Sequence, residues 1–302
     1  MIRFGLFTDM QYADREPARN RDYRKSLDKF IAVAGSFHQE KLSRVFHLGD
    51  IVNDGWSNLT QALELFDKSE LPLIHVLGNH DFIIDDDKKN RLPSLLRLPD
   101  CGYYAMELPD PDDPDNRWKC MILNGNENAP YVATNDSDRE KAERLREKYR
   151  LVSGNLPEPW NGTFSPKQLQ WLRDELNTAQ KENWRVLLCS HFPLYAQANT
   201  IQRAAAFGPL ANVGIYFSLM GVSAWNGQEM LSLIEAFPCV KAWFAGHLHE
   251  GSYGLRKNIH HVTFRGMVEA EPNAWSIITL AKNSIKIDGF GTEPDRELIF
   301  NH

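Results

Sequence analysis

Polar side chains suited to binding metal ions follow five separate apolar runs of the sequence. Each run has the length and composition of a buried strand, and the residues that follow are Asp9 with Gln11, Asp50, Asn79 with His80, His191, and His247 with His249. The two i, i+2 pairs place both of their side chains on one side of an extended chain. Imidazole, carboxylate and amide ligands without a thiolate suit Mn²⁺, iron, Zn²⁺ or Mg²⁺. The pattern therefore predicts a metal centre of hard and borderline ligands.

The stretch Gly78-Asn79-His80-Asp81 combines several roles in four residues. Because Asn79 and His80 are neighbours, their side chains point in divergent directions. One can hold a metal ion while the other faces a substrate, and Asp81 is near enough to orient an imidazole ring.

The first third of the chain must bring these residues together. Its periodicity predicts strands at residues 3–8, 44–48 and 73–77, separated by helices at 19–40 and 58–69. Strand, helix, strand, helix, strand is a βαβαβ unit with a parallel sheet, which makes this an α/β protein. Since ligands bind beyond the carboxyl ends of such strands, we expect the polar residues that follow the three strands to converge.

The rest of the chain continues this alternation with more antiparallel character toward its end. We expect a strand pair, two helices that begin near Ser165 and residue 226, and further strands, at residues 103–108, 118–123, 184–189, 240–245, 259–264, 275–280 and 285–287. Residues 124–163, which include a charged helix at 136–150, have too few apolar side chains for a core of their own and are interpreted as an insertion. Residues 194–224 suit a loop that covers the site and contributes to a base-binding wall.

Composition excludes several classes of protein. With 302 residues, 42% hydrophobic and 25% charged, the chain is long enough for one large domain or two modest ones. A net charge of −6 gives no electrostatic footprint for nucleic acid or for a membrane surface, and no apolar run is long enough to span a membrane. The first strand begins at Ile2 and the four cysteines are scattered without a CxxC pair, which favours a cytoplasmic protein with reduced thiols.

Together the motifs resemble those of the calcineurin-like metallophosphoesterases. The five are Asp9-Met10-Gln11, Gly49-Asp50, Gly78-Asn79-His80-Asp81, Ser190-His191 and Gly246-His247-Leu248-His249, in the order of that family and covering residues 9–249. The resemblance implies a four-layer αββα sandwich with two central mixed β-sheets, and a single metallophosphoesterase domain over residues 1–302.

The resemblance also implies a role for each residue. The first metal ion would be held by Asp9, Gln11, Asp50 and His249, and the second by Asp50, Asn79, His191 and His247, with Asp50 bridging. His80 would contact the phosphoryl group or the leaving oxygen, Asp81 would orient His80, and Asn53 would have a supporting role. In such a site a metal-bridging hydroxide attacks phosphorus in line.

One departure points to a branch of the family. The first motif usually has histidine where this chain has Gln11, and an amide oxygen there favours Mn²⁺ or Mg²⁺ over zinc. Segments across most of the chain resemble the manganese-dependent ADP-ribose/CDP-alcohol diphosphatases: residues 9–14, 21–27, 160–165, 224–226, 251–254, 266–269 and 294–296. This implies two divalent ions, with manganese favoured over iron, magnesium or zinc, and a small-molecule substrate such as ADP-ribose or a CDP-alcohol.

Alternative interpretations remain open at this point. The same centre could serve a cyclic-nucleotide or other phosphodiesterase, or a phosphomonoesterase, and the fold could be a non-catalytic binding scaffold. His47 and His75 lie inside apolar strands and are interpreted as satisfied core histidines rather than ligands. Four arginines follow the first motif, most of them expected on a solvated helix face, although one could bind a second phosphate: Arg15, Arg19, Arg21 and Arg24.

Overall fold

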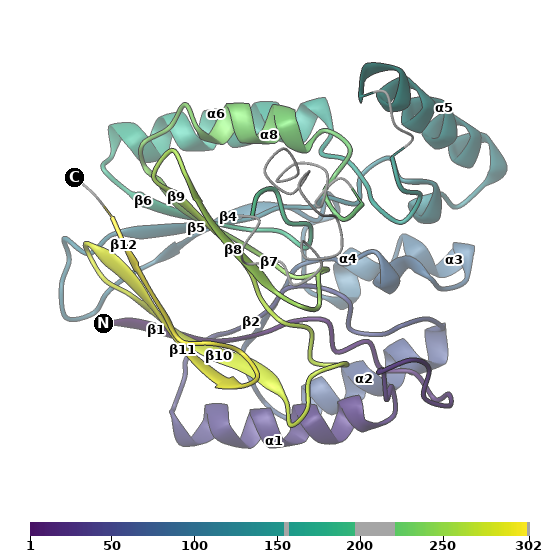
Figure 1. Ribbon diagram of the computed structural model, residues 1–302, viewed down its shortest axis with the longest axis horizontal. Helices are drawn as coiled ribbons and strands as arrows, with labels where there is room; N and C mark the ends of the chain where they lie inside the picture. The colour runs from purple at the N-terminus through teal and green to yellow at the C-terminus, as the bar shows by residue number, and fades with distance from the viewer. Residues whose placement is uncertain (154–156, 197–220, 301–302) are drawn as a thin grey trace, which may run out of the picture.

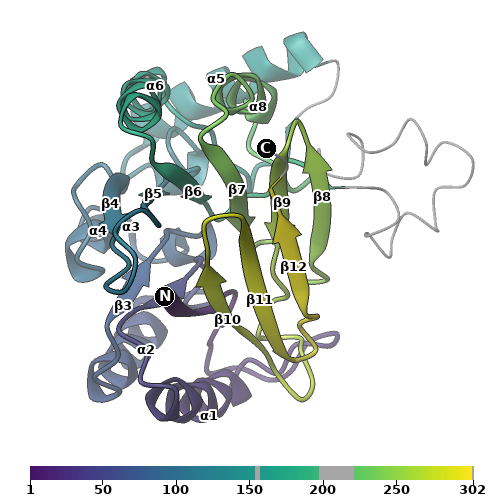
Figure 2. The ribbon, with the colours of Figure 1, turned by 90° about the vertical axis from the view of Figure 1, so that its left-hand side faces the viewer.

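The molecule contains two six-stranded sheets that pack face to face (Figures 1 and 2). The structure is a computed structural model that describes residues 1–153, 157–196 and 221–300. The first sheet has the strand order β12-β11-β10-β1-β2-β3. Its strands are β1 (Ile2–Phe7), β2 (Val45–His47), β3 (Leu73–His75), β10 (Ala274–Leu280), β11 (Ser284–Gly291) and β12 (Arg296–Ile299).

The second sheet has the order β4-β5-β6-β7-β9-β8. Strands β5, β6, β7 and β9 run parallel to one another, while β4 and β8 pair antiparallel at the two edges. The strands are β4 (Tyr104–Leu108), β5 (Trp118–Ile122), β6 (Arg185–Cys189), β7 (Val240–Ala245), β8 (Ser252–Arg256) and β9 (Ile259–Thr263).

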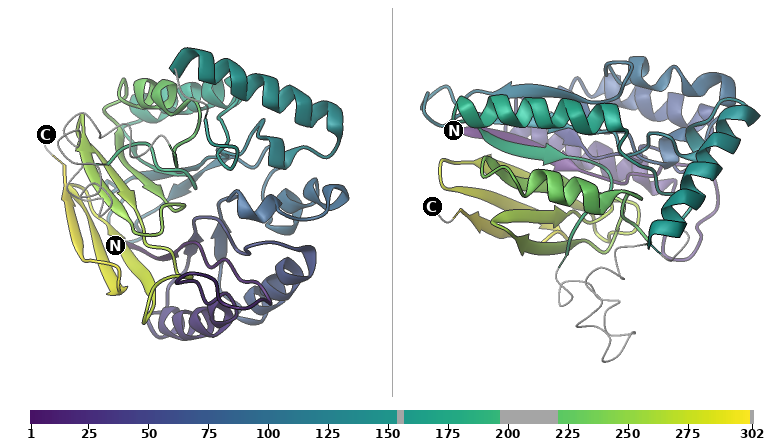
Figure 3. Two further views of the ribbon diagram at one scale, coloured as in Figure 1. Left: turned by 45° about the vertical axis from the view of Figure 1, so that its right-hand side comes forward. Right: turned by 90° about the horizontal axis from the view of Figure 1, so that it is seen from above.

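Helices cover the outer faces of both sheets. Figure 1 shows α1 and α2 below the first sheet and α6 and α8 above the second, and Figure 3 shows α5 extending to one side. The helices are α1 (Lys25–Gln39), α2 (Trp56–Lys68), α3 (Asp86–Lys89), α4 (Leu92–Leu95), α5 (Asp136–Ser153), α6 (Pro166–Lys181) and α8 (Gly227–Ile234), with 3₁₀ turns η1 (His80–Phe82) and η2 (Pro130–Val132). No helix among the described residues is both long and apolar enough to cross a membrane.

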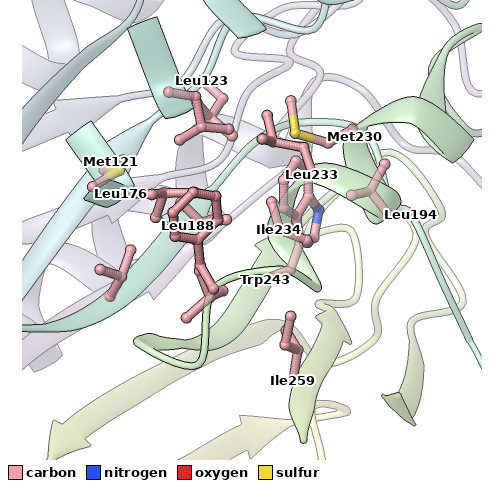
Figure 4. Close-up of a cluster of buried hydrophobic side chains, with 14 of the residues drawn as sticks. Met121, Leu123, Leu176, Leu188, Leu194, Met230, Leu233, Ile234, Trp243 and Ile259 are labelled. Atoms are coloured by element: carbon pink, nitrogen blue, oxygen red, sulfur yellow. The ribbon is translucent and has the colours of Figure 1, made fainter. Parts of the chain in front are cut away.

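Three apolar clusters bind these layers together. One lies between the two sheets and includes Phe4, Trp118 and Phe244. A second packs α1 and α2 on the first sheet, and a third packs α6 and α8 on the second sheet around Trp243 (Figure 4). Four layers with three cores between them confirm the predicted αββα sandwich with two mixed sheets.

Local features account for the start of α6 and for the late start of α1. Ser165 caps α6, since its hydroxyl accepts a hydrogen bond from the backbone N–H of Gln168 at 3.1 Å, and Pro166 occupies the first turn. Helix α1, predicted from residue 19, begins only at Lys25. Arg19 has a left-handed backbone (φ 57°), which a right-handed helix cannot contain.

The predicted parallel unit is present and positions the motifs. Strand β1 pairs parallel with β2, and β2 pairs parallel with β3. Two edge strands, β8 and β12, are absent from the prediction, and residues 197–220 of the predicted covering loop lie outside the described residues. The described part of the insertion at 124–163 forms η2 and α5.

Candidate metal centre

The predicted ligands come together at the carboxyl ends of β1, β2, β6 and β7 and in the turn after β3. Four of them have left-handed backbone conformations: Asp9 (φ 51°), Gln11 (φ 43°), Asp50 (φ 60°) and His247 (φ 68°). Non-glycine residues rarely adopt this conformation, and it concentrates at functional sites because the surrounding structure must enforce it. The strand ends therefore bend sharply where the chemistry is expected.

Two glycines of the motifs allow these bends to approach one another. A Cβ atom on Gly78 would lie 2.2 Å from Asp50 Oδ1, and one on Gly246 would lie 2.5 Å from Asp9 Oδ2. Since neither position has room for a side chain, the two aspartates sit directly against the backbone of neighbouring strand ends.

Four electron-pair donors meet at one point of the centre. His191 Nε2 lies 3.3 Å from Asp50 Oδ2, 3.1 Å from Asn79 Oδ1 and 3.2 Å from His247 Nδ1. One proton on His191 can serve only one of the three neighbours fully, whereas a divalent ion would accept an electron pair from all four. The donor set therefore fits the second ion predicted from sequence.

The first ion's predicted ligands lie beside this cluster. His249 Nε2 is 3.2 Å from Asp9 Oδ1. The other side of the Asp9 carboxylate is held by the Thr8 hydroxyl at 2.6 Å and by the backbone N–H of His247 at 3.0 Å. Asp9 thus ties the end of β1 to the end of β7 through the backbone N–H of His247.

Gln11 takes an orientation that the sequence does not predict. Its Nε2 donates to Asp50 Oδ2 at 2.9 Å, and its Oε1 accepts from Arg21 at 3.1 Å. A guanidinium only donates, so the oxygen must face Arg21 and the amide N–H₂ must face Asp50. In this arrangement Gln11 supports the predicted bridging carboxylate, and its role as a ligand of the first ion stays a prediction that requires the amide to turn.

Hydrogen bonds select one tautomer for each predicted histidine ligand. His191 Nδ1 lies 2.8 Å from the carbonyl oxygen of Leu48, and His249 Nδ1 lies 3.1 Å from Glu269 Oε1. An N–H at these positions leaves each Nε2 free to face the centre. His247 is reversed, because its Nε2 lies 3.0 Å from Asn161 Oδ1 and its Nδ1 faces the centre.

His80 and Asp81 do not interact as expected. His80 Nδ1 donates to the carbonyl oxygen of Asn53 at 2.7 Å, and the ring is partly exposed. The Asp81 carboxylate instead accepts from the backbone N–H groups of Asp50 (3.2 Å), Ile51 (2.7 Å) and Gly78 (2.9 Å). The prediction that Asp81 orients His80 is therefore wrong. Asn53 orients His80, and Asp81 fixes the backbone that carries Asp50.

The pKa values of these side chains reflect the same contacts. Burial alone would lower the pKa of His191, but Asp50 outweighs it and raises that pKa to about 9. Asp9 and Glu269 likewise raise the pKa of His249 to about 9 against the effect of burial. Burial and the neighbouring His191 lower the pKa of His247 to about 3. Burial, assisted by Asp50, raises the pKa of Asp81 to about 7.

Three supporting residues have contacts at the centre that the sequence analysis did not predict. Glu269 holds His249 and is itself held by Arg21 Nε at 2.6 Å and Asn20 Nδ2 at 3.0 Å. Asn161 contacts His247, and Arg21 links Glu269 to Gln11. All three lie in or beside the segments 21–27, 160–165 and 266–269 that resemble the diphosphatase branch. Of the four arginines after the first motif, Arg21 is thus the one at the centre.

The two histidines interpreted as satisfied core residues are buried, and the described residues leave three of their four ring nitrogens without a hydrogen bond. In the described part of the chain, three ring nitrogens have no hydrogen bond: Nδ1 and Nε2 of His47, and Nδ1 of His75. His75 stacks on Phe66 with the ring centroids 5.7 Å apart. They are core residues, as predicted, but these three ring nitrogens have no hydrogen bond among the described residues.

Comparison with known proteins agrees with this geometry. Two proteins named manganese-dependent ADP-ribose/CDP-alcohol diphosphatase are full-length relatives. The one from Xenopus laevis is 26% identical over 98% of this chain and 89% of its own length, and the human one is 27% identical over 98% and 92%. A solved dimetal phosphatase from Danio rerio shares the fold, with a TM-score of 0.78 at 23% identity over 99% of both chains.

The family itself follows from a match over most of the chain. Residues 2–251 match the family described as calcineurin-like phosphoesterase, and this range contains all the predicted ligands. The carboxylates, the amide and the three imidazoles of its motifs meet at one edge of the two sheets, as the motif order requires. The chain belongs to the calcineurin-like phosphoesterase family.

Proposed function

We propose that this protein is a two-metal hydrolase that cleaves the pyrophosphate bond of nucleoside diphosphate-linked small molecules. The observation that carries the proposal is the convergence of Asp50, Asn79, His191 and His247, with the partly exposed His80 beside them. The full-length relatives named as ADP-ribose/CDP-alcohol diphosphatases support this substrate class.

The residues divide into two overlapping ligand sets. One ion would be held by Asp50, Asn79, His191 and His247. The other would be held by Asp9, His249 and Asp50. Gln11 would join these three residues only if its amide oxygen turned away from Arg21. Two divalent ions in such a centre bind phosphate oxygens and activate water as a nucleophile. Manganese is the proposed metal, supported by the oxygen-rich first set and by the names of the relatives.

Charge at the centre favours an anionic substrate. Two divalent ions carry four positive charges, and the carboxylates of Asp9 and Asp50 remove two, so the loaded centre has a formal charge of about +2. The guanidinium of Arg21 adds a further positive charge at its edge. This local field attracts a pyrophosphate although the chain as a whole has a net charge of −6.

His80 is the proposed general acid or charge-stabilising group. The Asn53 carbonyl fixes the proton on Nδ1, and the backbone N–H of His80 donates to Asp50 Oδ1 at 2.9 Å. These two contacts hold the ring at the edge of the centre with its Nε2 available to the leaving oxygen. Such a group typically contributes about 10²–10⁴-fold to the rate.

We also infer a cytoplasmic location. The four cysteines are scattered along the sequence without a CxxC pair, and three of them are buried, which supports a reducing compartment.

The substrate class is tested by a comparison of four phosphoesters. With Mn²⁺, we expect the purified protein to hydrolyse ADP-ribose to AMP and ribose 5-phosphate, and CDP-choline to CMP and phosphocholine, with much higher kcat/KM than cyclic AMP or p-nitrophenyl phosphate. A preference for cyclic AMP or for the monoester would replace the pyrophosphate assignment. No turnover of any of the four would favour a binding scaffold.

A further inference from the structure

Asn161 lies beside the proposed second ion although it belongs to none of the five motifs. It is fully buried in the segment that precedes α6. Its Oδ1 is 3.0 Å from His247 Nε2, and its Nδ2 has no hydrogen-bond partner in the part of the chain that the structure describes. One end of the amide is therefore committed to a predicted metal ligand, and the other end is left without a contact.

The contact decides which nitrogen of His247 can bind an ion. A histidine that ligates a metal is neutral and carries a single N–H, on one of its two nitrogens. If the proton is on Nε2, it is donated to Asn161 Oδ1, and the lone pair of Nδ1 faces His191 Nε2 and Asp50. If the proton is on Nδ1, His247 has no electron pair to offer to the centre.

We propose that Asn161 is a positioning residue for the second metal ion, and that it acts by holding His247 as the Nε2–H tautomer. The proposal rests on the two-metal function proposed above. Asn161 contacts a ring nitrogen of His247 as Glu269 contacts a ring nitrogen of His249. The contacting oxygen belongs to a neutral amide in Asn161 and to a carboxylate in Glu269. Partners of this kind orient the ring and raise the affinity for the metal.

The backbone around Asn161 is built to hold the amide in place. A Cβ on Gly162 would lie 2.3 Å from the carbonyl oxygen of Gly125, so the segment packs directly on the 124–128 loop. The Gly162 carbonyl accepts from the backbone N–H of Trp225 at 2.8 Å, and the Thr163 hydroxyl donates to Asn226 Oδ1 at 2.7 Å. The backbone around Asn161 is thus held by the 124–128 loop and by residues Trp225 and Asn226.

A comparison with Asn226 separates a structural amide from this one. Both ends of the Asn226 amide are used: Oδ1 accepts from Thr163 and from the Phe164 N–H, and Nδ2 donates to the Phe164 carbonyl. An asparagine that served only the fold would be satisfied in the same way. Among the described residues the Nδ2 of Asn161 has no hydrogen bond, so the side chain of Asn161 serves His247 there and not the fold.

The test measures metal binding and not turnover. Metal-stripped wild type, Asn161→Leu and Asn161→Asp are titrated with Mn²⁺, and free Mn²⁺ is followed by electron paramagnetic resonance. We expect Asn161→Leu to bind one ion as the wild type does and the second roughly 10–100-fold more weakly. Asn161→Asp retains an acceptor and should bind both ions at least as tightly as the wild type.

Thr163→Val is the matched control, because it loosens the same segment without touching His247. It should leave both affinities unchanged. Equal loss in Thr163→Val and Asn161→Leu, or no loss in Asn161→Leu, would overturn the proposal. If Asn161→Leu does not fold, the tautomer of His247 is determined from the ¹⁵N ring signals of the Mg²⁺-loaded wild type. An Nδ1–H tautomer would refute the proposal. Absence of hydrolysis of both ADP-ribose and CDP-choline would refute the proposed function and leave this result standing.

Discussion

His80 differs from the three histidines that face the centre in where its free nitrogen points. His191, His247 and His249 each direct one nitrogen at another predicted ligand, whereas His80 has one nitrogen on the Asn53 carbonyl and its ring partly exposed. Its backbone N–H, and not its side chain, contacts Asp50. A substrate group can therefore reach His80 without displacing a ligand.

Replacement of His80 should separate catalysis from metal binding. We expect His80→Ala to reduce kcat for ADP-ribose by about 10²–10⁴-fold, since it removes the group at the leaving oxygen. The number of Mn²⁺ ions bound should stay at two, because the ring holds no ligand atom. Steady-state kinetics and a Mn²⁺ titration of the same preparation give the two readouts. Unchanged kcat would show that another group carries the charge of the leaving oxygen.

Gln11 allows an equally direct test. Because its oxygen accepts from Arg21 and its nitrogen donates to Asp50, we expect Gln11→Leu to remove one hydrogen bond from Asp50 while two Mn²⁺ ions still bind. Affinity for the first ion should fall by less than about tenfold. This limit corresponds to the lower end of the free energy that one hydrogen bond to a charged group contributes. Loss of one ion in the titration would instead identify the amide oxygen as a ligand.

Residue types and spacing were sufficient to predict which side chains meet at the centre. They were insufficient for roles that depend on side-chain rotation or on distant segments. The oxygen of Gln11 faces Arg21, and Arg21 is held in place by Glu269. Glu269 lies 248 residues from Arg21 along the chain. Asp81 follows His80 directly, but η1 begins there and turns the carboxylate back toward Gly78 and Ile51.

At the scale of elements, strands with strong apolar periodicity were predictable and weak edge strands were not. The βαβαβ unit follows from buried runs separated by helical spacing, as do strands β6 and β7 with α6 and α8 before them. Strand β8 contains Gly254 and pairs only with β9, and β12 is four residues long with two charged side chains. Short, charged edge strands protect a sheet from aggregation and carry little hydrophobic signal.

The buried strand histidines should make the fold sensitive to acid. Burial lowers the pKa of His75 to about 4, while the unfolded chain protonates this residue near 6.5. Below 6.5 the unfolded state therefore binds a proton that the folded state refuses, and stability falls until about pH 4. The loss is at most roughly 1.4 kcal/mol per pH unit for one histidine.

Replacement of His75 by an apolar ring should remove this part of the acid sensitivity. We expect His75→Phe, which can retain the stacking on Phe66, to match or exceed the wild type at pH 7.5. Its advantage in unfolding free energy should grow as the pH falls to 4.5, measured by urea denaturation at each pH. A constant difference between the two proteins across that range would mean that His75 is protonated equally in both states.

At the scale of the whole molecule, the centre concentrates charge at one edge of two packed sheets. Asp9 and Asp50 are both fully buried; Asp50 Oδ2 lies 3.3 Å from His191 Nε2, and Asp9 Oδ1 lies 3.2 Å from His249 Nε2. The residues come from both sheets, so their mutual attraction or repulsion acts on the packing between the sheets. Metal ions should therefore stabilise the entire fold and not only the strand ends.

We expect Mn²⁺ to raise the melting temperature, and to raise it more at pH 8.5 than at pH 6.5. In the metal-free protein the pKa values of His191 and His249 are raised to about 9, so below that pH both rings keep protons that an ion must displace. Each displaced proton weakens binding by up to roughly tenfold per pH unit, and the stabilisation follows RT ln(1 + [Mn²⁺]/Kd). Thermal denaturation with EDTA and with excess Mn²⁺ at the two pH values measures the difference.

The metal-free protein should show the opposite trend. A histidine with a raised pKa stabilises the folded state below pH 6.5, and that contribution is lost as the pH rises through about 9. With EDTA the melting temperature should thus fall from pH 6.5 to pH 8.5, while the interval between the EDTA and Mn²⁺ curves widens. An interval that does not depend on pH would show that the ions bind a centre whose histidines are already neutral. Proton release during Mn²⁺ binding, measured calorimetrically in buffers of different ionisation enthalpy, would then be close to zero instead of approaching two per protein.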